Sequence, residues 1–448
     1  MKKPQLFIQF MILVASLIPT LASQPQVQAA DSQDIWIITD LHYLSPSLHD
    51  KTGEAINHIR NTGAGKDFDY GPQRMEALIY WVEEDQPDYL VVSGDLTLNG
   101  ELASMQDLAA YFDRIEALGT QVLVTPGNHD IASGWARAFQ GEDFIKTDQV
   151  MAEDFAALFK AHGFDQALSR DPHSLSYVYA LDPQTWVIML DSNIYAEGQG
   201  KGQPITKGRL KPENMVWLSD RLAEADQAGV KVIPVSHHNS LDHHERLKAN
   251  YTLENAVDYR ALLAKYQVPL TLSGHIHTQH IASLTQGDWA LTDIVTGAFS
   301  SAPSYVGKLK VTPQGLSYQA EPLDLVTWAK AEQTDDPNLL DYPSYIAETF
   351  NKASRQMAYG EMIESGWYQK DDPFLDQIAD YVALVNLAYF SGHPLQEKDL
   401  AAFENLAEIR DTIDQKAFYR FKAYIEAIEA SQTDHRYLDL VPWPNPLP

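Results

Sequence analysis

The chain has 448 residues, of which 45% are hydrophobic and 21% are charged, a composition typical of a globular protein rather than a disordered one. Its formal net charge of −28 gives a surface that repels nucleic-acid backbones and anionic membranes, so we expect neither as an extended partner. The absence of cysteine excludes disulfides, thiolate metal sites and a cysteine-anchored lipoprotein.

The N-terminal segment has the pattern of a secretory signal peptide. Lys2 and Lys3 precede an apolar run over residues 6–22, and the small residues Val27 and Ala29 stand before the expected cleavage site. We therefore predict a signal peptide over residues 1–29 and a secreted or extracytoplasmic protein with no stable membrane insertion after cleavage. The alternative is a retained membrane anchor, which is disfavoured because the apolar run is short for a spanning helix.

Short apolar runs alternate with amphipathic stretches from residue 35 to about residue 322. The runs are rich in Val, Ile and Leu without in–out alternation, as in strands buried on both faces; they cover residues 35–39, 89–93, 122–125, 186–190, 230–236, 268–273 and 291–296. Helical periodicity lies between several of them, at residues 74–85, 105–119 and 213–229. The alternation predicts a layered α/β domain over residues 30–322, with a largely parallel sheet or pair of sheets.

Two long connections interrupt this pattern, at residues 44–71 and 192–211. Both are rich in residues that favour loops, and neither has a clear period. Loops of this length in a compact domain are often functional, but a tolerated surface insertion explains them equally well.

The pattern changes after Pro322, where no further apolar strand-like run occurs. Residues 342–365, 373–392 and 397–431 have helical periodicity, which predicts an all-α C-terminal domain over residues 323–448. The proline-rich tail is expected to be extended.

Polar side chains follow five of the predicted strands, directly where each strand ends. The segments are Asp40-Leu41-His42, Gly94-Asp95, Gly127-Asn128-His129-Asp130, His237-His238 and Gly274-His275-Ile276-His277. Because the carboxyl ends of strands in an α/β sheet share one edge, we expect these groups to converge there.

The residue types in these segments are those of a metal site. Asp, Asn and His supply oxygen and nitrogen donors suited to Mn, Fe or Zn. Where two donors stand two residues apart, as in Asp40 and His42, extended backbone places both on the same side. Glycines at three of the segments permit tight turns and close approach of the backbone. The sequence therefore predicts a dinuclear metal site at the edge of the sheet.

In these five segments, across residues 35–299, the chain resembles the calcineurin-like metallophosphoesterases. The resemblance implies a four-layer α/β/β/α sandwich holding two divalent or mixed-valence transition metal ions (Mn, Fe or Zn) about 3.5–4 Å apart. It assigns Asp40, His42 and His277 to one metal and Asn128, His237 and His275 to the other, with Asp95 bridging both. It also makes His129 the catalytic residue that meets the phosphoryl group or the leaving oxygen.

The fourth segment departs from the pattern of many members, because Asn239 stands where they have proline. This leaves a choice between His237 and His238 as the ligand. If Val235 points into the core, period-two alternation places His237 on the same side, which favours His237.

The segments "DLHYLSP" and "GDLTLNGE", together with the helical extension, look most like bacterial cyclic-nucleotide phosphodiesterases with a C-terminal helical domain. This resemblance implies hydrolysis of cyclic nucleotides to nucleoside monophosphates by a dinuclear-metal hydroxide mechanism. A phosphomonoesterase or another phosphodiesterase of the same fold is the alternative, and a non-catalytic secreted binding protein with a metal site is a third reading. The oligomeric state stays open.

The number of basic residues near the five segments bears on the choice between a diester and a monoester substrate. No Arg or Lys adjoins the five segments, and the nearest basic cluster in the sequence is Lys201, Lys207, Arg209 and Lys211. A doubly charged monoester gains more from a basic fork than a singly charged diester does, so the absence favours a diester such as a cyclic nucleotide.

Overall fold

The computed structural model describes residues 32–244, 247–364, 373–396, 398–399 and 433–444. The predicted signal peptide and nearly all of the third predicted C-terminal helix (residues 397–431) lie outside these ranges. Among the helices that are described, none is both long enough and apolar enough to span a bilayer.

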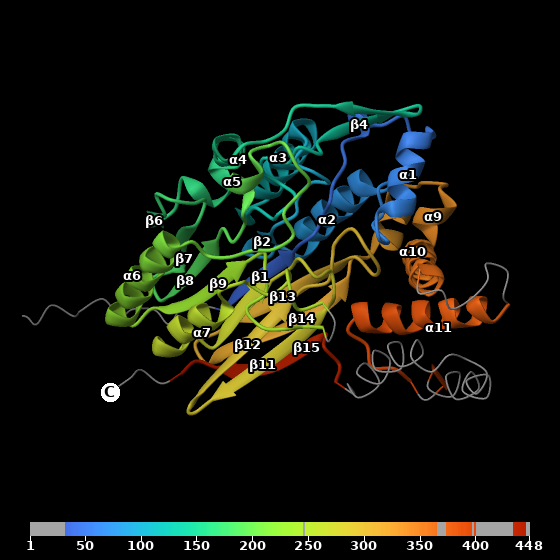
Figure 1. The fold of residues 1–448 in the computed structure, drawn as a ribbon. Coiled ribbons are helices and arrows are strands. Elements are labelled where there is room, and N and C mark those ends of the chain that lie inside the picture. The colour runs from blue at the N-terminus through green and yellow to red at the C-terminus, as the bar shows by residue number, and fades with distance from the viewer. Residues whose placement is uncertain (1–31, 245–246, 365–372, 397, 400–432, 445–448) are drawn as a thin grey trace, which may run out of the picture.

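Two mixed sheets form the centre of the molecule (Figure 1). The first sheet is parallel at β1, β2 and β3 and antiparallel beyond them. Its order is β15 (Tyr437–Pro442), β14 (Gly315–Pro322), β13 (Tyr305–Val311), β1 (Gln33–Ile38), β2 (Tyr89–Ser93) and β3 (Gln121–Thr125).

The second sheet is parallel from β8 to β12 and antiparallel at both edges. Its order is β11 (His280–Gln286), β12 (Trp289–Val295), β10 (Leu270–Ser273), β9 (Lys231–Ser236), β8 (Thr185–Leu190), β7 (Tyr177–Asp182) and β6 (Ser169–Arg170). A separate hairpin consists of β4 (Arg137–Gln140) and β5 (Asp143–Lys146).

Helices cover the outer face of each sheet. Apolar side chains of α2 (Gly71–Asp85) and α3 (Leu102–Ala117) join the main core, which also holds Ile37 of β1 and Val235 of β9 and so fills the space between the sheets. A second core packs α6 (Pro212–Ala228) and α7 (Ala256–Lys265) on the other sheet. The predicted α/β/β/α layering with a helical C-terminal region is confirmed.

The remaining helices lie in connections or in the C-terminal region. They are α1 (Glu54–Thr62), α4 (Ala152–Leu158), α5 (Tyr195–Gly198), α8 (Leu325–Ala331), α9 (Pro337–Leu340), α10 (Tyr342–Glu364) and α11 (Pro373–Phe390). Figure 1 shows α10 and α11, in orange, packed against each other at one side of the molecule, near α1.

The expectation that no strand follows Pro322 is wrong in one place. Residues Tyr437–Pro442 form β15, which pairs antiparallel with β14 at the edge of the first sheet. The segment's composition did not indicate a strand, because its regular structure comes from the free edge of β14, which supplies the backbone hydrogen bonds. The C-terminal region thus leaves the α/β domain as helices and returns to it as a strand.

Candidate metal centre

The structure brings the five strand-end segments together at one edge of the two sheets. Backbone hydrogen bonds join them across strands: Asp40 N donates to Gly94 O at 3.0 Å, and Gly274 N donates to His237 O at 3.0 Å. Two groups of side chains result, each with its donor atoms within 4.8 Å of one another. The first holds Asp40, His42, Asp95 and His277, and the second holds Asp95, His237 and His275.

In the first group, ring nitrogens of two histidines and a carboxylate oxygen lie close together. His42 Nε2 lies 3.1 Å from His277 Nε2, and Asp40 Oδ1 lies 3.3 Å from His277 Nε2. Asp40 is fully buried, yet its Oδ1 has no hydrogen-bond partner among the described residues. A buried acceptor of this kind is costly unless a cation binds it, so the group fits a metal ion.

The second group shares Asp95 with the first. Asp95 Oδ2 lies 3.3 Å from His237 Nε2 and 3.6 Å from His42 Nε2. Asn128 adjoins the second group, with its Oδ1 3.2 Å from His237 Nε2. All seven predicted ligands therefore lie in one cluster with Asp95 at its centre, and this donor set of carboxylate, amide and imidazole fits two transition metal ions.

The electrostatics of the cluster favour a bound cation. Burial would raise the pKa of Asp95, but the imidazoles of His237 and His129 hold it well below its usual range. Burial lowers the pKa of His237, and the stronger effect of Asp95 raises it to about 9. The buried carboxylates thus favour positive charge at His237, a charge that a bound metal ion would supply in place of a proton.

Several ligands occupy the left-handed backbone region, which residues other than glycine rarely adopt. Asp40, His42, Asp95, His275 and His277 have φ values of 52°, 39°, 50°, 72° and 63°. Each such residue costs on the order of 1–3 kcal/mol, and strain of this kind clusters at functional sites. The strain here is the cost of turning these side chains toward one point.

Two glycines allow the close approach of the segments. A Cβ atom at Gly127 would lie 2.1 Å from Asp95 N, and one at Gly274 would lie 2.0 Å from Thr39 Oγ1. Any side chain at either position would push the ligand-bearing turns apart.

His129 belongs to the same site without lying in either metal group. Its backbone N donates to Asp95 Oδ1 at 2.9 Å, and its ring lies edge-on to that of His42, with the centroids 5.0 Å apart. Its Nδ1 lies 2.7 Å from Leu98 O, a carbonyl that can only accept, so Nδ1 carries a proton. Nε2 is then the ring atom left to exchange a proton with a substrate.

His238 and Asp130 have different partners from the metal ligands. His238 Nδ1 lies 2.8 Å from Ser192 Oγ and its Nε2 lies 3.0 Å from Thr206 O, so this ring anchors the 192–211 connection while His237 faces Asp95. The Asp130 carboxylate accepts from the backbone N of Leu96, Thr97 and Gly127 at 2.8–3.0 Å, which makes it the cap of the Asp95 turn.

A cavity of about 620 Å³ opens over the metal cluster. Both long connections reach it, and one wall comes from α10 and α11. The C-terminal helices thus border the site, as the change of pattern after Pro322 and the lack of any site motif beyond it led us to expect. Besides Asp95, Asn128, His129, His275 and His277, its lining includes Lys66, Thr206, Tyr251, Phe350, Ser354, Met357, Asn386 and Phe390. Within the described residues, no member of either metal group comes from the C-terminal region.

Lys66 supplies the positive charge near the metal cluster that the sequence did not predict. It is 29 residues from Asp95 in the chain, but it lines the cavity beside Asp95 and His129. The lack of basic residues beside the five segments therefore does not favour a diester, because the fold brings Lys66 to the site from a distant part of the chain.

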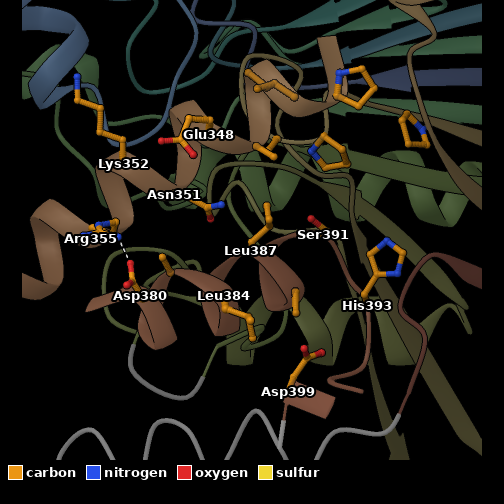
Figure 2. Close-up of a pocket in the computed structure, with 18 of the residues that line it drawn as sticks. Glu348, Asn351, Lys352, Arg355, Asp380, Leu384, Leu387, Ser391, His393 and Asp399 are labelled. Carbon is orange, nitrogen blue, oxygen red and sulfur yellow. Dashed lines mark ion pairs between the residues drawn. The ribbon is translucent and has the colours of Figure 1, made fainter. Parts of the chain in front are cut away.

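A second cavity, of about 860 Å³, lies between the α10–α11 pair and the loop near Pro303 (Figure 2). Its charged residues include Lys352, Asp399 and Arg355, and Arg355 forms an ion pair with Asp380. It contains none of the strand-end residues, so the smaller cavity over the metal cluster is the candidate active site.

Glu101 is connected to His129 through Asn99, and its ionisation is expected to make the stability of the protein depend on pH. Glu101 Oε2 accepts from Asn99 N at 2.9 Å, and Asn99 Oδ1 lies 3.2 Å from His129 Nδ1. Burial raises the pKa of Glu101 from 4.5 to about 7. Between these pH values the folded protein keeps a proton that the unfolded chain has lost, so the contribution of Glu101 to stability decreases as pH rises through this window.

Glu101→Gln is therefore expected to gain stability relative to the wild type as pH rises from 5 to 8, by up to about 3 kcal/mol. Urea unfolding of both metal-saturated proteins at these two pH values measures the difference. A difference that does not change with pH would show that Glu101 ionises normally in the folded protein.

Comparison with known families supports the same region as the site. Residues 34–279 match the family described as "Calcineurin-like phosphoesterase", and residues 324–434 match the "C-terminal domain of cyclic nucleotide phosphodiesterase". The first match contains all five strand-end segments.

Individual relatives are distant. A protein named "Probable glycerophosphodiester phosphodiesterase" from Arcobacter nitrofigilis is 23% identical over 62% of this chain and 85% of its own length. One named "Probable cyclic nucleotide phosphodiesterase" from a Synechococcus species is 25% identical over 46% of this chain and 65% of its own. Among solved structures, a dimetal phosphatase from Danio rerio aligns with 65% of this chain and 96% of its own, at 11% identity and a TM-score of 0.44.

Proposed function

Since the chain belongs to the calcineurin-like phosphoesterase family and is a hydrolase of phosphoric esters, we propose that its substrate is a cyclic nucleotide, opened to a nucleoside monophosphate. The observation that carries this proposal is the match of residues 324–434 to the C-terminal domain of cyclic nucleotide phosphodiesterases. The helices of that region form one wall of the cavity over the metal cluster. A segment that marks one class of phosphodiesterase thus lies where a substrate would contact it.

The lining of the cavity is compatible with a nucleotide. It combines the metal cluster and Lys66 with the aromatic side chains of Tyr251, Phe350 and Phe390. A phosphodiester needs the polar groups, and a nucleobase is suited to aromatic and apolar contacts.

The residues divide the chemistry among them. When bound, two metal ions activate water as a nucleophile at neutral pH and neutralise charge on the phosphoryl oxygens. Asp40, His42 and His277 would hold one ion and Asn128, His237 and His275 the other, with Asp95 between them. His129, oriented by the Leu98 carbonyl, would give a proton from Nε2 to the departing oxygen when its ring is in the doubly protonated imidazolium form, and would keep the proton on Nδ1.

We also propose that the protein acts outside the cytoplasm, because its first 29 residues have the pattern of a cleaved signal peptide. N-terminal sequencing of the protein recovered from the envelope or the medium of expressing bacteria tests this. A mature N-terminus at Ala30 is expected, and an intact Met1 would contradict it.

A substrate panel tests the proposed activity. We expect kcat/KM for a 3′,5′- or 2′,3′-cyclic nucleotide to exceed that for a linear diester and for AMP, with slow hydrolysis of the resulting monoester. The measurement uses chromatography of products from cyclic AMP, cyclic GMP, their 2′,3′ isomers, a linear diester, glycerophosphocholine and AMP, all with the Mn-loaded protein.

Three outcomes would replace the proposal. A preference for AMP would indicate a phosphomonoesterase. A preference for glycerophosphocholine would favour a glycerophosphodiester substrate, which is the substrate class in the name of the Arcobacter relative. Failure to hydrolyse any ester with metals bound would instead indicate a binding protein.

A further inference from the structure

We propose that Lys66 is a catalytic residue that contacts the substrate, with its ammonium group binding a phosphoryl oxygen at the metal cluster, and that α10 positions it through Asp67. This inference deepens the proposed function, since it names the group that recognises the anionic part of the substrate. Lys66 lies in the 44–71 connection, outside every strand-end segment.

The first support is the position of Lys66. It lines the cavity over the metal cluster together with Asp95, Asn128 and His129. Within the described residues its side chain makes no ion pair or hydrogen bond, although the site contains two buried carboxylates, Asp95 and Asp40. An ammonium group that faces a cavity and has no protein partner is available to an anionic ligand.

The electrostatics agree with this position. Burial lowers the pKa of Lys66, and Asp95 and Asp40 oppose that effect, so the ammonium group lies within the field of both carboxylates. Burial lowers the pKa values of His42 and His129, and the charge of Lys66 acts in the same direction on both.

The second support is the rigid turn that presents Lys66. The preceding Gly65 has a φ of +84°, and a Cβ there would lie 3.0 Å from the ring of Phe350 on α10. The following Asp67 donates its backbone N to Ser300 O at 2.7 Å, and Ser300 Oγ donates to Asp40 O at 2.7 Å. Lys66 is thus tied to a metal ligand on one side and to α10 on the other.

The Asp67 carboxylate completes the link to α10. It forms a buried ion pair with Arg74, and it accepts hydrogen bonds from Tyr342 Oη and Tyr345 Oη, each at 3.1 Å. Arg74 also donates to Tyr342 Oη at 3.0 Å. A buried network of this kind has few alternative geometries, because any shift leaves a charge unpaired. It makes Tyr342 a positioning residue for Lys66.

Substitution of Lys66 tests the contact. Lys66→Met is expected to lower kcat/KM for a chromogenic phosphodiester about 10- to 100-fold and to raise the inhibition constant of inorganic phosphate by a similar factor, as expected for a lost charge-assisted hydrogen bond. Lys66→Arg should retain most of both. Lys51→Met, an exposed lysine in the same connection, should stay within about twofold of the wild type.

Manganese content and melting temperature are measured for every variant. Unchanged kcat/KM and phosphate affinity in Lys66→Met would overturn the proposal, and so would loss of bound manganese, which would assign Lys66 to the metal site instead. If the wild type binds manganese but hydrolyses no phosphodiester, the proposed function fails, and the phosphate affinity of the two proteins still decides the role of Lys66.

A double-mutant comparison tests the positioning role of Tyr342. Tyr342→Phe removes one hydrogen bond to Asp67 and is expected to lower kcat/KM several-fold in the wild type but not in Lys66→Met, because the displaced group is then already absent. Equal losses in both backgrounds would show that Tyr342 acts on stability alone.

Discussion

Asp95→Ala is expected to abolish hydrolysis and to remove two-metal occupancy together. Asp95 is the one residue shared by both metal groups, with Oδ2 3.3 Å from His237 Nε2 and 3.6 Å from His42 Nε2. Its loss should therefore exceed the about 10- to 100-fold effect that is usual for residues which only orient a metal ligand. Elemental analysis after loading with Mn or Fe, together with kcat/KM on a chromogenic phosphodiester, measures both effects.

The control is Asp191→Ala, which removes another buried carboxylate at a strand end. Asp191 accepts from Tyr195 Oη at 2.9 Å and belongs to neither metal group, so its loss should reduce stability while leaving two metals bound. A wild type that binds no transition metal after loading would refute the dinuclear centre, and an active Asp95→Ala variant with two metals would refute its bridging role.

His129→Ala is expected to keep the metal content of the wild type while kcat falls about 10²–10⁴-fold, the range for a lost general acid. The structure explains why metal binding should survive: the link from His129 to Asp95 is through the backbone N, which alanine retains. The loss should be smaller for a nitrophenolate leaving group, which needs no protonation.

Kinetics with good and poor leaving groups, together with elemental analysis, measures this effect. His173→Ala, which removes an exposed imidazole, serves as the control and should not change kcat. Equal losses for both leaving groups would leave His129 the role of holding the phosphoryl group, and loss of metal would place it among the ligands.

The strands that the sequence revealed are those buried on both faces. The run predicted at residues 89–93 coincides with β2, and the run at residues 230–236 differs from β9 by one residue. The side chains on both faces of these strands are apolar, so a continuous run of apolar residues identifies each strand. Strand β14 was missed, because its buried and partly exposed residues alternate and so form no continuous apolar run.

The candidate ligands could be chosen from the sequence because each follows a strand, and parallel strands bring their carboxyl ends to one edge. The choice between His237 and His238 was also accessible, since Val235 is buried in the core between the sheets and alternation places His237 on its side. Nothing local to the chain indicated that His238 would instead anchor the 192–211 connection through Ser192.

By itself, then, the sequence determined the α/β layering, the strand-end donor set and the helical character of much of the C-terminal region, because these depend on periodicity and on residue type at strand ends. Only the tertiary structure decided which side chains of the helices and long connections line the cavity over the metal cluster. Lys66 lines the cavity next to Asp67, which is paired with Arg74 and accepts a hydrogen bond from Tyr342 of α10, and β15 forms because β14 offers a free edge. Such contacts join residues that are far apart in the chain, and their energy comes from partners that no local pattern contains.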